Sequence, residues 1–289
     1  MLTRREWNKL ALGGVTASLL PGGLLRAAEK PNSKFHGVQI GVQSYSFRDR
    51  SLDDAIQGML DVGLSSCELF QGHVEPRGQE REALRQWRLT VPLDDFRKVR
   101  EKFDRAGIEL YAYNLSFRDD FTDAEIARGF DMAKALGVRV LTASSNVSTA
   151  KRIDPFARKA KIRVGMHNHS AIRPNEFATP DDFVKAMEGA SKYIAINLDI
   201  GHFTAANFDA VDFLAKHHER IVTLHIKDRK RNQGETVPLG QGDAPIKEVL
   251  ELLKKHKWKI PANIEYEYRG GDTVEEVKRC LAYCRQALA

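Results

Sequence analysis

The feature that most constrains the fold is a regular alternation of short apolar runs and longer amphipathic segments, which begins near residue 37. Each apolar run leads through a turn into an amphipathic stretch, a pattern typical of βαβ units and a parallel sheet. Eight strands are predicted, at residues 38–45, 65–70, 108–114, 138–143, 162–167, 193–199, 221–226 and 261–266. Eight repeats in about 250 residues favour a closed (β/α)8 TIM barrel, a single-domain α/β fold, over an open sheet.

Helix ends are also marked in the sequence. Thr122-Asp123-Ala124-Glu125 has the form of a capping box, which predicts a helix that begins there. Gly63 and Gly107 each follow a predicted helix and precede a strand, the position at which glycine commonly ends helices. These signals place the helices between the predicted strands, as a barrel requires.

The first 28 residues differ from the rest of the chain. Arg4 and Arg5 precede a weakly apolar run from Leu10 to Leu25, and small residues follow at 27–28. This pattern is typical of a twin-arginine (Tat-type) export signal, so we interpret residues 1–28 as that signal and residues 29–289 as the barrel. An exported, periplasmic protein without a stable membrane span in the mature chain is therefore expected. The alternative is an uncleaved amphipathic N-terminal helix.

Charge and cysteine content bear on partners. The formal net charge is +6, and half of it lies in the predicted signal, so the mature protein is only mildly basic. Such a charge gives no case for nucleic-acid binding. The three cysteines form no CxxC motif, so no disulfide scaffold is expected. The sequence does not determine the oligomeric state, and a homo-oligomer is one of the possibilities.

Four predicted strands deliver a metal-type side chain at or near the carboxyl end. His167, Asp199, His225 and Glu265 are spaced by 32, 26 and 40 residues, about one strand-plus-helix unit each time. Because the carboxyl ends of barrel strands converge near the axis, these side chains are predicted to meet. A mixed nitrogen and oxygen set suits one Mn²⁺, Zn²⁺, Co²⁺ or Fe²⁺ ion better than Mg²⁺ or Ca²⁺. Glu267 lies on the same strand face as Glu265 and is the alternative ligand.

Further polar side chains lie at or just past the predicted strand ends. We predict acid–base roles for Glu68, Lys227 and Glu267, and substrate contacts for Asn114, His169 and His202. Aromatic residues on barrel strands usually fill the core, and this is predicted for Tyr45, Tyr111 and Tyr113. Two long connections, residues 71–93 and 228–245, leave the carboxyl ends of strands and are predicted to be substrate lids.

Four motifs of this chain resemble those of the xylose-isomerase-like TIM-barrel superfamily, the sugar phosphate isomerase/epimerase family. They are Leu-Asp-x-Gly-His at 198–202, Leu-His-Ile-Lys-Asp at 224–228, Leu-Gly-Gln-Gly-Asp at 239–243 and Ile-Glu-Tyr-Glu at 264–267. That superfamily holds sugar isomerases and epimerases, inosose dehydratases and apurinic-site endonucleases. The resemblance covers essentially all of the mature chain.

The resemblance implies a role for individual residues. Asp199, His225 and Glu265 match the metal ligands of the sixth, seventh and eighth strands, and His202 matches a histidine that contacts substrate. The chain departs from the ketose epimerases on the fifth strand, where His167 stands in place of a glutamate. Those enzymes use the fifth- and eighth-strand glutamates as an acid–base pair, so a two-glutamate epimerisation is not expected here.

The resemblance implies a metal-dependent sugar isomerase or epimerase that works through a metal-stabilised enediolate. Because export argues against a phosphorylated substrate, a free or keto-sugar is expected. The alternatives are a keto-sugar or keto-inositol lyase or hydratase, similar to inosose dehydratase, and a non-catalytic sugar-binding barrel. An apurinic-site endonuclease would need a basic DNA-facing groove and more histidines than this sequence offers for the site.

Overall fold

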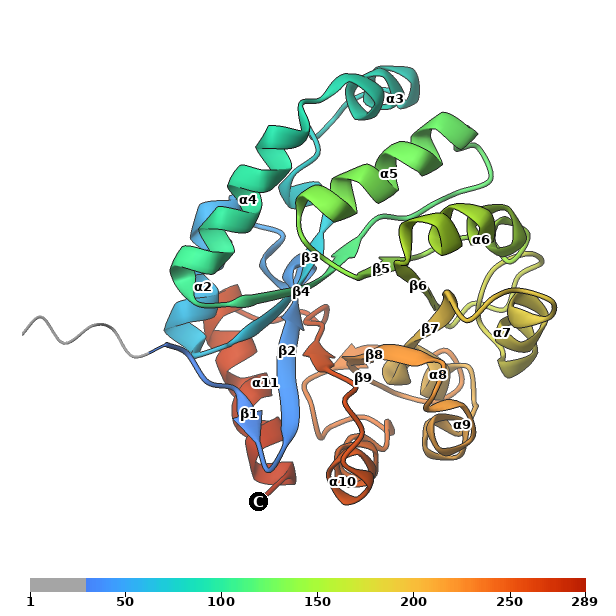
Figure 1. The fold of residues 1–289 in the computed structure, drawn as a ribbon. Coiled ribbons are helices and arrows are strands. Elements are labelled where there is room, and N and C mark those ends of the chain that lie inside the picture. Colours follow the sequence, from blue (N-terminus) through green and yellow to red (C-terminus); the bar gives the residue numbers. More distant parts are fainter. Residues whose placement is uncertain (1–29) are drawn as a thin grey trace, which may run out of the picture.

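The computed structural model describes residues 30–289 and shows a closed barrel of parallel strands surrounded by helices (Figure 1). The strand order is β1-β2-β11-β8-β7-β6-β5-β4-β3, and β3 pairs back with β2 to close the barrel. The barrel strands are β2 (Val38–Gln43), β3 (Ser66–Phe70), β4 (Glu109–Asn114), β5 (Val140–Ala143), β6 (Arg163–His167), β7 (Ile194–Asp199), β8 (Ile221–Ile226) and β11 (Ala262–Ile264). The predicted (β/α)8 fold is confirmed, and all eight predicted strands are present.

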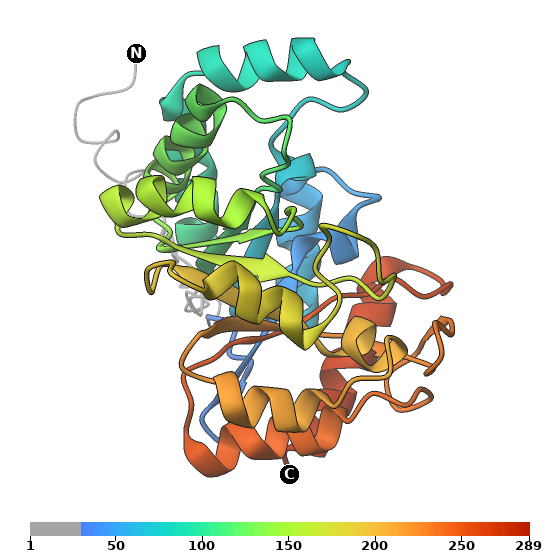
Figure 2. The same ribbon diagram turned by 90° about the vertical axis from the view of Figure 1, so that its right-hand side faces the viewer.

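Helices cover the outside of the barrel (Figure 2). They are α2 (Leu52–Val62), α3 (Arg81–Thr90), α4 (Leu93–Ala106), α5 (Asp123–Ala135), α6 (Thr149–Ala160), α7 (Pro180–Met187), α8 (Ile200–Ala205), α9 (Ala210–His217), α10 (Ile246–His256) and α11 (Thr273–Ala287). The capping box of Thr122 and Glu125 is present at the start of α5. Gly63 and Gly107 end α2 and α4 with φ of 87° and 69°, the left-handed region that glycine tolerates best.

The predicted export signal, residues 1–28, lies outside the described residues. Within residues 30–289, no helix combines the length and the apolar character that crossing a membrane requires. Cys67, Cys280 and Cys284 are buried and free, so they pack as small apolar residues.

The barrel interior changes from apolar to polar along its axis. One layer consists of Ala112, Val140, Ala195 and Val222, with Tyr111 packed against it. Next comes a buried polar layer, defined here as Glu68, Thr142, Asn197, Thr223 and Asn263, linked by hydrogen bonds such as Asn263 Nδ2 to Thr223 Oγ1 at 2.9 Å. A buried polar layer needs its partners in place, since an unpaired polar group is costly to bury. The strand ends beyond this layer hold the predicted site residues.

Helix α3, within the predicted lid 71–93, packs against α5 through an ion-pair cluster. Arg81 Nη1 lies 2.9 Å from Glu125 Oε1, and Arg85 Nε lies 3.0 Å from Glu125 Oε2. Burial raises the pKa of Glu125, but hydrogen bonds from Arg81, the Thr122 amide and Arg85 outweigh burial and lower the pKa to about 2. The charged face of α3 is therefore a structural contact with α5.

We expect Glu125→Gln to lower the free energy of unfolding by about 3 kcal/mol at pH 7, because it leaves the two arginines without their carboxylate. The unfolded carboxyl titrates near pH 4.3, roughly, so its stabilising effect is complete above that pH and is lost as pH falls towards the folded pKa. The stability gap between wild type and Glu125→Gln should thus narrow between about pH 5 and about pH 2. Urea unfolding at a series of pH values measures this difference in the free energy of unfolding. Glu251→Gln, on the exposed face of α10, is the control. A difference in unfolding free energy that stays constant with pH would contradict the role of the Glu125 carboxylate in this ion-pair cluster.

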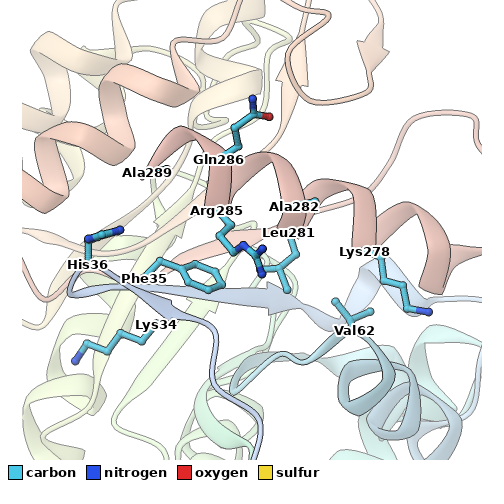
Figure 3. A pocket seen from close by; sticks show the side chains of 10 residues that line it. All are labelled: Lys34, Phe35, His36, Val62, Lys278, Leu281, Ala282, Arg285, Gln286 and Ala289. Atoms are coloured by element: carbon cyan, nitrogen blue, oxygen red, sulfur yellow. The ribbon is translucent and has the colours of Figure 1, made fainter.

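An open hollow of about 800 Å³ lies at the amino-terminal end of the barrel (Figure 3). It is bounded by β1 (Lys34–Phe35) and by α11, including Leu281 and Arg285. None of the predicted site residues lines this hollow. In barrels of this kind the amino-terminal face contributes to stability, whereas sites form at the opposite face.

Candidate metal centre

The four predicted metal ligands lie together at the carboxyl ends of four adjacent strands. His167 ends β6, Asp199 ends β7, His225 lies on β8 and Glu265 directly follows β11. One ligand atom from each residue lies within 4.8 Å of the others, and all four residues are buried. Parallel pairing aligns Asp199 with His225 and His225 with Asn263, so the strand register itself brings the ligands together.

The donors fit a divalent cation. Asp199 Oδ2 is buried and accepts no well-oriented hydrogen bond from residues 30–289, although Lys227 Nζ lies 3.0 Å away. The Lys227 ammonium is thus a positive partner for this oxygen, and a carboxylate oxygen has lone pairs for a second one. Burial lowers the pKa of His167 well below its ordinary value, which leaves the neutral imidazole that a metal requires. The donor set therefore suits a metal of the Mn²⁺, Zn²⁺, Co²⁺ or Fe²⁺ kind.

His225 lies between two carboxylates. Its Nδ1 is 3.0 Å from Glu265 Oε2, and its Nε2 is 3.0 Å from Glu68 Oε2. Burial would lower the pKa of His225, but the adjacent charges of Glu68 and Glu265 raise it well above its ordinary value. A metal that binds this imidazole must therefore displace a proton held by the two acids.

Lys227 places its ammonium among the carboxylates of the site. Its Nζ lies 3.0 Å from Asp199 Oδ2, 2.9 Å from Glu265 Oε2 and 2.7 Å from Glu267 Oε2. Burial would lower the pKa of Lys227, but these three carboxylates raise it, so the side chain is charged. A cation held by Asp199 and Glu265 would compete with this ammonium for the same oxygens.

A pocket of about 240 Å³ opens above these residues. The predicted residues that line it are Asn114, His167, His169, His202, His225, Lys227, Glu265 and Glu267. Asp199 lies behind this lining. Glu68 is fully buried in the polar layer and does not line the pocket. The acid–base candidates that a ligand could reach are therefore Lys227 and Glu267.

His202 lies between two cationic side chains. Its Nδ1 lies 2.8 Å from Arg229 Nη1, and its Nε2 lies 3.1 Å from Lys227 Nζ. Burial lowers the pKa of His202 well below its ordinary value. The ring of His169 lies 5.3 Å from that of His202, so two neutral imidazoles border one side of the pocket.

Several pocket residues were missed by sequence reasoning. They are Gln43, Tyr45, Phe70, Ser116, Arg118 and Ser144. The prediction that Tyr45 fills the core is wrong, because its ring borders the pocket edge-to-face with Phe70 at 5.1 Å. Tyr113, in contrast, is fully buried as predicted. The missed serines and Arg118 lie within a few residues of the predicted strand ends, and that position was their only signal.

The two predicted lids do not line the pocket. Within residues 71–93, α3 packs against α5, as described above. Residues 228–245 contain the short hairpin of β9 (Asp228–Arg229) and β10 (Thr236–Val237), which holds Arg229 beside His202. In this structure the second connection supports a site residue, and neither connection covers the pocket.

Fold and site together define a (β/α)8 barrel with a candidate metal centre at the carboxyl ends of its strands. The chain belongs to the xylose isomerase-like TIM barrel family, whose model matches residues 59–287. An uncharacterized protein of Methanocaldococcus jannaschii, MJ1311, is 30% identical over 114 residues, which cover 38% of this chain and 39% of that protein. The match thus spans well under half of that relative.

Solved structures share this fold at low sequence identity. The 3-keto-D-glucoside 4-epimerase YcjR of E. coli is 12% identical with a TM-score of 0.66, over 86% of this chain and 99% of that one. The probable 3-DHS dehydratase AsbF of Bacillus anthracis is 15% identical with a TM-score of 0.66, over 85% and 98%. A sugar phosphate isomerase/epimerase of Parabacteroides distasonis is 20% identical with a TM-score of 0.61, over 86% and 93%. These similarities show the fold.

Proposed function

We propose that this protein is a metal-dependent sugar isomerase or epimerase that acts on a free or keto-sugar. The observation that carries the proposal is the convergence of His167, Asp199, His225 and Glu265 within 4.8 Å beside a pocket. A divalent metal bound there would polarise a sugar carbonyl and stabilise the negative charge that develops when the neighbouring C–H loses its proton. A twin-arginine export signal, as proposed for residues 1–28, makes an unphosphorylated sugar the expected substrate.

The pocket residues supply the remaining functions. The rings of Tyr45 and Phe70 offer an apolar face for the C–H side of a sugar ring. Asn114, His169 and His202 provide polar groups for its hydroxyls on the other walls. The volume of about 240 Å³ lies below that of pockets for drug-sized ligands, so it suits a single sugar unit.

Glu267 is the base best placed for proton transfer. Its side chain is 30% exposed and lines the pocket, so a substrate C–H can approach its carboxylate. Lys227 Nζ lies 2.7 Å from Glu267 and can donate a proton to a sugar oxygen. The pair thus offers one base and one acid on the same wall of the pocket.

A lyase or dehydratase is the second candidate, and one observation favours it. His167 stands on β6 where the ketose epimerases carry a glutamate, so among residues 30–289 the carboxylates that line the pocket are Glu265 and Glu267, just after β11. Elimination needs one base to take the proton beside the carbonyl and one acid to protonate the departing β-hydroxyl as water. Glu267 and Lys227 would serve in these roles, and the resemblance in fold to a probable 3-DHS dehydratase agrees with this alternative.

The test begins with metal analysis of the wild-type protein by mass spectrometry, followed by incubation of metal-loaded protein with keto-sugars in D₂O. Stoichiometric Mn, Zn, Co or Fe and deuterium exchange into an isomeric or epimeric sugar would support the main proposal. An unsaturated or dehydrated product would support the lyase instead. Tight sugar binding without turnover would leave a sugar-binding barrel, and wild type without metal even after reconstitution would refute the metal centre.

Lys227→Met is expected to tighten metal binding by roughly tenfold or more, because it removes a positive charge about 3 Å from two ligand carboxylates. Turnover should fall in the same variant, since the proposed acid is lost. Isothermal titration calorimetry measures the affinity, with Lys247→Met on the exposed face of α10 as control. Weaker metal binding in Lys227→Met would show that the ammonium supports the ligands and does not compete with the metal.

A further inference from the structure

Glu68 is a buried acid that the proposed reaction does not use. Its carboxylate is fully buried and receives hydrogen bonds from three neutral side chains: Gln43 Nε2 at 3.2 Å, Thr142 Oγ1 at 2.6 Å and Asn263 Nδ2 at 3.0 Å. These donors come from three different barrel strands, so the carboxylate is fixed on the barrel axis. Burying a carboxylate costs desolvation free energy, so a buried carboxylate is usually paired with a group of opposite charge.

That partner is the imidazole of His225. Its Nε2 lies 3.1 Å from Glu68 Oε1 and 3.0 Å from Glu68 Oε2. Its Nδ1 points the other way and lies 3.0 Å from Glu265 Oε2, which lines the pocket. Since Nε2 faces Glu68 inside the barrel, Nδ1 is the nitrogen presented to the pocket side.

We propose that Glu68 is a positioning residue for the metal centre, which accepts the Nε2–H hydrogen bond of His225 and thereby fixes Nδ1 as the ligand atom. This inference rests on the proposed metal centre. Glu68 acts in two ways: it sets the tautomer and the ring orientation of His225, and it places a negative charge directly behind the ligand. Acids that hold a metal-binding histidine in this way commonly affect metal affinity 10- to 100-fold, as an order of magnitude.

A purely structural role for Glu68 would have different consequences. It would lower stability when removed but leave the metal affinity of the folded protein unchanged. The chain offers a matched control in Thr223, which is equally buried in the polar layer and hydrogen-bonds Asn263 but has no hydrogen bond to Glu68 or His225. Thr223→Val therefore disturbs the same layer without cutting the proposed contact.

The experiment compares the dissociation constants of Zn²⁺ for wild type, Glu68→Gln and Thr223→Val by competition with a chelating dye, after melting curves confirm folding. We expect Glu68→Gln to bind about 10- to 100-fold more weakly and Thr223→Val to stay within about threefold of wild type. Equal affinities of Glu68→Gln and wild type, or equal losses in both variants, would overturn the proposal. Wild type that binds no Zn²⁺ would instead refute the metal centre on which it rests.

A second measurement covers the case in which Glu68→Gln does not fold. The ¹⁵N shifts of His225 in Zn²⁺-loaded wild type should show metal on Nδ1 and a proton on Nε2. Metal on Nε2 would overturn the proposal without any variant. Glu68→Asp keeps the charge but withdraws it from His225, and it should weaken Zn²⁺ binding in the same direction as Glu68→Gln.

Discussion

Glu267→Gln is expected to lower kcat by a factor of about 10² to 10⁴, the range that positioned acid–base groups contribute. The reason is geometric: Glu267 is the carboxylate that lines the pocket with its side chain 30% exposed, whereas Glu68 is sealed inside the barrel. The amide keeps the size of the side chain but cannot accept the proton. Steady-state kinetics with the keto-sugar found in the screen measures the effect.

The controls for Glu267→Gln separate chemistry from loss of metal. Metal content by mass spectrometry should be unchanged, because Glu267 is not among the four clustered ligands. Glu248→Gln, an exposed position on α10, should leave kcat within about threefold of wild type. If Glu267→Gln retains wild-type kcat, the base lies elsewhere. If it loses its metal as well, Glu267 is a ligand, the alternative assignment that the sequence left open.

Asp199→Asn is expected to weaken metal binding by more than about 100-fold, beyond the effect common for residues outside the ligand set. The substitution removes the charge of a buried ligand but keeps Oδ1, which accepts a 2.7 Å hydrogen bond from the His202 amide at the start of α8. The helix cap should therefore survive, so loss of metal would not arise from local unfolding. His167→Ala should lose metal as well, since it removes the nitrogen donor of β6.

Mass spectrometry of the metal in purified Asp199→Asn and His167→Ala measures this prediction. His256→Ala is the control, because this histidine is exposed on α10 and far from the site in the fold. Both ligand variants should lack metal, and His256→Ala should contain the wild-type amount. Stoichiometric metal in Asp199→Asn would contradict the ligand assignment, whatever its activity.

The sequence predicted the barrel and the convergence of the four candidate ligand side chains, because both follow from short-range patterns. An apolar run that ends in a polar residue identifies the end of a strand, and parallel strands in a closed barrel bring such ends together. His167, Asp199 and His225 were found in this way, and the register pairs Asp199 directly with His225.

Depth along the barrel axis could not be predicted in this way. Glu68 lies on an inward-facing position like the candidate ligands, yet its carboxylate is fully buried in the polar layer and does not line the pocket. Strand periodicity gives the face of a residue but not the stagger between strands. Tyr45 was misplaced for a related reason, because β2 ends at Gln43 and a 3₁₀ turn directs the ring to the pocket.

The contacts of α3 show a second limit of prediction from sequence. The sequence predicted a lid for residues 71–93, but Arg81 and Arg85 in this segment pair with Glu125, which is about 40 residues away at the start of another helix. No local pattern links such residues. Only the three-dimensional arrangement shows that α3 packs against α5 and not over the pocket.

The ammonium of Lys227 also bears on how the protein matures. With three carboxylates around it, the chain carries its own counter-ion for a cluster of buried negative charge. Small metal-dependent domains unfold without their ion because metal binding supplies much of their folding free energy. Here the buried core supports the barrel and Lys227 offsets the negative charge of the cluster, so we expect the barrel to fold without metal and to bind it afterwards.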